Sequence, residues 1–249
     1  MSRPVPSSAL LRSEWTKLRS VRATWWCSGL YLLAVGGTGW LAAASTDSSA
    51  RAGIAVQTAL TGFGFGQLLL VVLGVLAVSS EFASGSVLVS LTAVPRRTRW
   101  LAAKTVVVTA WCLALSAVLA AVCALAARTL TAVPGGVQVT DPEVLRILGL
   151  QVVSAGLVGV LSVAFGVALR STAGAVGLGA GLTFVLPPIL ALVGGAVASR
   201  VSQGLPALRV GQDAFLAAST TWPVGMAVLG AWAIGSWAAG AALLERRDV

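Results

Sequence analysis

Residues 58–79 read TALTGFGFGQLLLVVLGVLAVS, an apolar stretch without a single Asp, Glu, Lys or Arg. An α-helix rises about 1.5 Å per residue, so roughly 20 such residues cross a hydrocarbon core about 30 Å thick. Because lipid offers no hydrogen-bond partners to peptide groups, the segment must satisfy its own backbone as a helix. The stretch therefore predicts a membrane-spanning helix.

Five other stretches share this composition and comparable length: residues 24–44, 105–127, 147–169, 174–198 and 223–243. The chain is 57% hydrophobic and only 10% charged, whereas soluble domains usually carry about a quarter charged residues. We therefore expect an all-α integral membrane protein with six transmembrane helices. It should form a single transmembrane domain over residues 1–249, with a cytoplasmic leader (1–23), a six-helix bundle (24–243) and a cytoplasmic tail (244–249).

Basic residues in the connecting segments predict the orientation. With the N-terminus inside, twelve of the 17 Lys and Arg residues fall on the inner side and five on the outer side. The positive-inside rule then places both termini in the cytoplasm. The net charge of +9 would also suit a nucleic acid, but no segment is long or polar enough to fold into a basic face. We expect no nucleic-acid partner.

The composition argues against several kinds of chemistry. The chain contains no His, and all eight acidic residues lie outside the six apolar stretches. A metal site, a proton relay and an intramembrane protease would each require such groups within the bilayer. A phosphate-binding loop ends in Gly-Lys-Ser/Thr, but the two lysines follow Thr16 and Ala103. We expect no enzyme activity and no cofactor on this chain; if ATP and Mg drive it, another subunit binds them.

The leader predicts an amphipathic helix from about Ser8 to Arg22 that lies in the headgroup plane. Its apolar face comprises Leu10, Leu11, Trp15, Leu18 and Val21. The helix either anchors the topology or also contacts a cytoplasmic partner.

The segment after the second helix reads SEFASGSVLVSLTAVPRRTRW over residues 80–100. Glu81 emerges at the membrane edge, and Gly85 permits a sharp change of direction. Apolar residues then recur at helical spacing until Pro95 ends the pattern. We predict a short helix parallel to the membrane that could act as a lever. The alternative is an ordinary reverse connection followed by a positive-inside cluster.

Four segments carry a resemblance to a known family. They are LRSEWTKLRSVRATWW (11–26), EFASGS (81–86), Val94-Pro95-Arg96-Arg97 and Ala103-Lys104. They resemble the ABC-2 type transporter permeases of actinobacteria, the membrane-spanning subunits of ABC transporters. The six-helix layout, with a longer external loop before the sixth helix, is also similar; in this family that loop (199–222 here) forms short helices that dip into the outer leaflet.

The resemblance implies a permease subunit in a bacterial cytoplasmic membrane, which we expect to export its substrate. The mostly apolar composition of the bundle suggests that this substrate is lipophilic. A separate ATPase subunit would drive the permease, and a second permease copy or a paralogue would complete the transporter. The short helix after the second span would be a coupling helix that docks on the ATPase. The implied coupling residues are Glu81, Gly85, Val87, Leu88, Leu91, Val94, Pro95, Arg96 and Arg97.

The resemblance also implies a leader interface with the ATPase and a translocation path at a dimer interface between helices two and five. The leader residues are Leu11, Glu14, Trp15, Lys17, Leu18 and Arg19. The path candidates are Phe63, Phe65 and Gln67 in helix two and the kink at Pro187 and Pro188 in helix five. Helix packing is the alternative role for each path residue.

Two other function classes stay open at this point. One is a gradient-driven secondary carrier or channel, against which the missing intramembrane charges count. The other is a non-transporting membrane scaffold or immunity protein, which helix packing alone does not distinguish from a permease.

Overall fold

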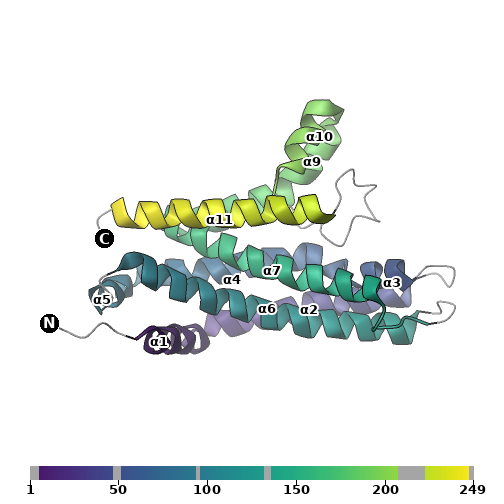
Figure 1. Ribbon diagram of the computed structural model, residues 1–249, viewed down its shortest axis with the longest axis horizontal. Coiled ribbons are helices and arrows are strands. Elements are labelled where there is room, and N and C mark those ends of the chain that lie inside the picture. Colours follow the sequence, from purple (N-terminus) through teal and green to yellow (C-terminus); the bar gives the residue numbers. More distant parts are fainter. Residues whose placement is uncertain (1–5, 47–51, 94–95, 132–135, 207–221, 247–249) are drawn as a thin grey trace.

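The computed structural model describes residues 6–46, 52–93, 96–131, 136–206 and 222–246. Within these ranges every regular element is helical (Figure 1). Six helical segments are long and apolar enough to cross a membrane. The all-α, six-span prediction is confirmed.

The first span is α2 (Arg22–Ala44), and the second is α3 (Ala52–Ala59) followed by α4 (Gly62–Ala83). The third and fourth are α6 (Arg97–Leu130) and α7 (Pro142–Leu169). The fifth combines α8 (Thr172–Ala180), a π-helical turn η1 (Gly181–Val185) and α9 (Leu186–Val193), and the sixth is α11 (Trp222–Arg246). Outside the spans lie α1 (Ser7–Ser20), α5 (Ser86–Ala93) and α10 (Gly195–Gln203).

Several spans differ from the sequence-based boundaries by a few residues, and the third and fifth are examples with identifiable causes. The third helix begins at Arg97 instead of Thr105, because a helix can continue beyond the hydrocarbon core where charged residues are tolerated. The predicted fifth helix (174–198) ends at Val193, where Gly194 and Gly195 take positive φ values of 66° and 84°.

The fifth span is also irregular inside, at the predicted proline kink. Pro187 and Pro188 cannot donate backbone hydrogen bonds, and their rings crowd the carbonyls one turn earlier. The helix relieves this crowding by widening into η1 directly before them. Beyond Val193 the chain turns into α10, which projects from the bundle beside α11 (Figure 1). The helix α10 includes the first residues of the predicted outer-leaflet loop (199–222). Residues 207–221 of that loop lie outside the described part.

The fourth span, α7, packs against α4, α6 and α11. Small residues allow this close approach. A Cβ added at Gly74 of α4 would overlap the Ser162 side chain of α7, and one at Gly156 of α7 would lie 2.7 Å from Leu113 of α6. The three helices α4, α6 and α7 therefore form the packed centre of the bundle.

We call one end of the bundle the leader end; it carries α1, α5, the start of α6 and the end of α11 (Figure 1). There the Arg97 guanidinium donates a hydrogen bond of 2.8 Å to the Leu244 carbonyl of α11. The leader end is the one predicted to face the cytoplasm.

Candidate functional site

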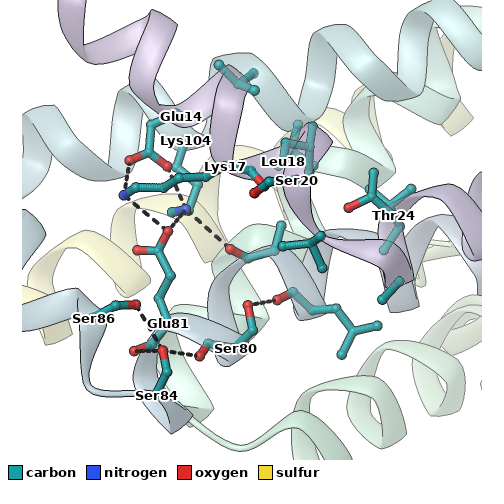
Figure 2. Close-up of a pocket in the computed structure, with 17 residues that line it drawn as sticks. Glu14, Lys17, Leu18, Ser20, Thr24, Ser80, Glu81, Ser84, Ser86 and Lys104 are labelled. Atoms are coloured by element: carbon teal, nitrogen blue, oxygen red, sulfur yellow. Dashed lines mark hydrogen bonds and ion pairs between the residues drawn. The ribbon is translucent and has the colours of Figure 1, made fainter.

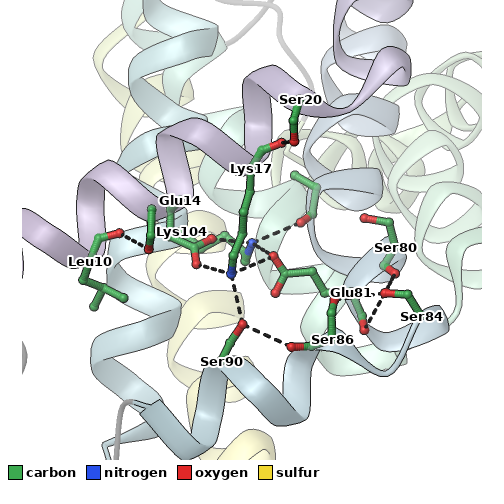
Figure 3. A network of polar contacts seen from close by, with 12 residues as sticks. Leu10, Glu14, Lys17, Ser20, Ser80, Glu81, Ser84, Ser86, Ser90 and Lys104 are labelled. Carbon is green, nitrogen blue, oxygen red and sulfur yellow. Dashed lines mark hydrogen bonds and ion pairs between the residues drawn. The ribbon is translucent and has the colours of Figure 1, made fainter.

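Four charged side chains from three helices meet at the leader end (Figure 3). Lys104 Nζ of α6 lies 2.6 Å from Glu14 Oε2 of α1 and 2.8 Å from Glu81 Oε1 of α4. Lys17 Nζ of α1 lies 2.7 Å from Glu14 Oε1 and 3.2 Å from the same Glu81 oxygen. We call these four residues the charge cluster.

The charge cluster is largely buried and contains two carboxylates and two ammonium groups. The side chains of Glu14, Lys104 and Glu81 are 2%, 4% and 10% exposed, and that of Lys17 is 39% exposed. Buried charges are tolerated only when paired, because removing an ion from water costs several kcal/mol. Lys104 also donates hydrogen bonds to the Ala77 carbonyl at 3.2 Å and to Glu81 Oε1 at 2.8 Å, which add to its ion pairs.

Lys17 connects the charge cluster to α5. Its Nζ lies 3.0 Å from Ser90 Oγ, in the second half of that helix. Partial burial lowers the pKa of Lys17, but the hydrogen bond to Glu14 and the charges of Glu14 and Glu81 outweigh it, so the pKa is raised above 10.5. Lys17 therefore stays charged and bridges α1, α4 and α5.

The predicted short helix is present as α5, and its geometry follows from the residues before it. Gly85 takes a φ of 69°, a conformation that favours glycine, and so turns the chain out of α4. Val87 is 2% exposed and packs inward, whereas Leu88 is 49% exposed. The side chain of Leu91 and the residues Val94 and Pro95 lie outside the described part. Arg96 is exposed directly before α6.

Comparison with known protein families decides what kind of chain carries this site. The profile of the ABC-2 family transporter proteins matches residues 10–187, well over half of the chain. The chain belongs to this family. The match contains the whole charge cluster and, with the six spans, makes the chain a multi-pass ABC transporter permease. A search of curated proteins returns no match.

In this ABC-2 permease much of the predicted apolar face of the leader helix packs inward, with Leu18 buried and Leu10 and Leu11 partly buried against the core. Glu14 and Leu18 are its buried residues, because Glu14 meets Lys104 rather than solvent. Trp15, predicted on the apolar face, is 38% exposed and packs edge-on against Trp111 of α6, with ring centroids 5.4 Å apart. The inward side chains of Glu14 and Leu18 are thus held by the permease itself, while Arg19 is exposed.

The predicted path residues separate into two groups. Phe63, Gln67 and Pro187 are buried in the permease chain. Phe65 is 64% exposed and touches Phe184 of η1, with ring centroids 5.8 Å apart; Pro188 is exposed. The structure thus brings the outward aromatic residue of the second span to the irregular turn of the fifth. Their role in a path stays a prediction.

The sequence analysis named all four cluster residues or their motifs but did not predict that they meet. One signal was available, because the permease has only two lysines among its 17 basic residues, and both lie in the charge cluster. A lysine ammonium is compact and directs three donors at separate acceptors, whereas an arginine presents a planar fork.

Proposed function

We propose that this permease is driven by a separate ATP-binding-cassette ATPase subunit and exports a lipophilic substrate across a bacterial cytoplasmic membrane. It works with a second copy of itself or with a paralogue. The observation that carries the proposal is the charge cluster, which joins α1 and α5 to the second and third spans.

Force applied to α5 has a defined route into the membrane. Along the chain, α5 is attached to α4 only through the turn at Ser84 and Gly85. Beside this turn, Lys17 contacts both Ser90 of α5 and Glu81 of α4. A displacement of α5 therefore moves the end of α4 directly and pulls on α1 through Lys17.

The same route reaches the third span. Lys104 of α6 pairs with both Glu14 and Glu81, so α6 cannot separate from α1 and α4 without leaving buried charges unpaired, which is costly. The proposal assigns ATP and Mg to the partner, since the sequence offers no phosphate-binding loop. The exposed apolar side chain of Leu88 on α5 supports docking of the ATPase there.

A pull-down with a substituted coupling helix tests the assignment. We expect the permease purified from its native membranes to carry an ATPase subunit, and Leu88→Asp to reduce the recovered ATPase at least about tenfold, since each 1.4 kcal/mol of lost affinity is a factor of ten. Leu145→Asp is the matched control, because Leu145 is 53% exposed near the start of α7, at the end opposite the leader end.

Three outcomes would contradict the proposal. Undiminished recovery of the ATPase with Leu88→Asp would remove α5 as its docking site. ATP hydrolysis by the purified permease alone would remove the division of labour between subunits. Transport into vesicles without nucleotide or partner would instead favour a gradient-driven carrier.

A further inference from the structure

A cavity of about 410 Å³ lies next to the charge cluster (Figure 2). It is partly open and is bounded by the end of α1, the start of α2, the last turns of α4, the start of α5 and the part of α6 around Lys104. Its volume falls within the range of about 300–1,000 Å³ that is usual for small-molecule sites. Because these helix ends belong to the leader end, the cavity lies where the spans leave the predicted inner leaflet.

The cavity has an apolar wall and a polar end. Leu73, Leu76, Val107 and Val108 supply apolar surface from α4 and α6. The polar end carries Glu81 and Lys17, together with the hydroxyls of Ser80, Ser84 and Ser86. A ligand that matches both parts is an amphiphile with a small polar head.

Glu81 has an unused acceptor. Both lysines of the cluster approach its Oε1, at 2.8 and 3.2 Å, while Oε2 is buried without a hydrogen-bond partner among the described residues. Glu14 Oε2 likewise accepts no well-directed hydrogen bond among the described residues, but the Lys104 ammonium lies 2.6 Å from it and balances its charge. A buried acceptor left unpaired costs about 1–3 kcal/mol, and more when it is charged, so Glu81 favours a bound donor.

We propose that this cavity binds an amphiphile with an ammonium head group, which donates to Glu81 while its hydrocarbon part lies against α4 and α6. Lys17 is the most exposed member of the cluster and makes its longest contact, 3.2 Å to Glu81. It can turn toward the headgroup region, so that the ligand's ammonium takes its place and the charges stay balanced. An anionic head group would instead be repelled by the carboxylates of Glu14 and Glu81. Binding to the single chain does not depend on the proposed transport function.

Photolabelling of the full chain in phosphatidylcholine nanodiscs tests the proposal. The probe is dodecylamine with a diazirine on its alkyl chain, and the comparison compound is the corresponding alcohol. We expect saturable labelling of peptides around Leu73 and Val107 by the amine, competed by unlabelled dodecylamine but not by dodecanol. Glu81→Gln should lower the saturable labelling at least about tenfold. Glu143→Gln, an exposed residue at the start of α7, should leave it unchanged.

A second variant keeps the test decisive if Glu81→Gln does not fold. Ala77→Phe adds a ring to the cavity wall and keeps all four charged side chains; it should also abolish saturable labelling while the permease elutes as a single species. Equal labelling by amine and alcohol, or unchanged labelling in both variants, would overturn the proposal and leave water as the partner of Glu81.

Competition identifies the source of the ammonium. Displacement of the probe by phosphatidylethanolamine in the nanodisc would assign the cavity to a membrane lipid. Displacement only by soluble alkylamines would assign it to a free lipophilic amine. Either result supports ammonium recognition, and failure of both competitors contradicts it.

Discussion

The fourth and fifth spans are consecutive and almost equally apolar, with mean hydropathies of 2.3 and 2.1 in their most apolar windows. Their burial differs greatly: 67% of the most apolar part of the fourth span is buried, against 17% of that of the fifth. Hydropathy therefore determines which segments enter the membrane, but it does not determine which of them form the centre of the bundle.

The contacts of small residues explain the difference. Gly74 and Gly156 lie in helix–helix contacts that a single added Cβ would disturb. Of the glycines in the fifth span, Gly179 lies in such a contact, since its Cβ would lie 2.5 Å from Val71 of α4, but a Cβ at Gly177 or Gly181 would meet nothing within 4 Å. Near its end, Leu192 is 88% exposed. The fifth span is attached at the leader end, where the Thr172 hydroxyl donates to Ser79 of α4 at 2.8 Å. One span is thus fixed by this chain, and the other presents a face to lipid or to a second copy.

The largest expected effect comes from removing an ion pair of the charge cluster, which joins α1 to α4 and α6 in the packed part of the bundle. Lys104→Met leaves two buried carboxylates, Glu14 and Glu81, with only the partly exposed Lys17 as a cation, so we expect the free energy of unfolding to fall by about 3–5 kcal/mol. Unfolding in sodium dodecyl sulfate, followed by tryptophan fluorescence, measures the change.

The matched control is Arg128→Met, an exposed residue near the other end of α6, which should change stability little. Adding Glu14→Leu to Lys104→Met should recover part of the lost stability, because it removes one of the two buried carboxylates that Lys104 had paired. A loss below about 1 kcal/mol for Lys104→Met would contradict a buried, paired role.

Paired glycine substitutions sharpen the comparison directly. Gly74→Ala forces α4 away from Ser162 and should cost about 1–3 kcal/mol. Gly177→Ala has no neighbour to displace and improves helix propensity, so it should be neutral or stabilise the isolated chain by up to about 1 kcal/mol. The same unfolding assay distinguishes them, and equal losses would refute the difference in packing. A defect of Gly177→Ala that appears only in the assembled transporter would place this face against another subunit.

The smallest effect is expected for Lys17→Met. Lys17 is 39% exposed, so solvent screens its ion pairs and the loss should be about 0.2–1 kcal/mol. Because its folded-state pKa is raised above 10.5, its contribution is complete below that pH and is lost as the pH rises through the folded value. Unfolding curves of the wild type and Lys17→Met should therefore differ at neutral pH and converge at strongly alkaline pH. A difference that grows with pH would have the wrong sign.

The sequence by itself determined the six spans, the leader helix and the turn at Gly85. Each of these follows from a local constraint: a peptide group in lipid must bond within its own helix, and a positive φ favours glycine. The sequence also located the irregular turn before Pro187 and Pro188, because the missing backbone donors of proline are a local constraint too. It did not predict that the fifth helix ends at Val193.

Only the tertiary structure decided which apolar helices are buried, and that Glu14, Lys17, Glu81 and Lys104 share one site beside a cavity. The members of this cluster come from three helices, and Glu14 and Lys104 are far apart along the chain. Their pairing depends on how α1 crosses α4 and α6, which no local pattern specifies. A charge near a membrane edge can be solvated equally well in the headgroups, and only the packing of neighbouring helices removes that alternative.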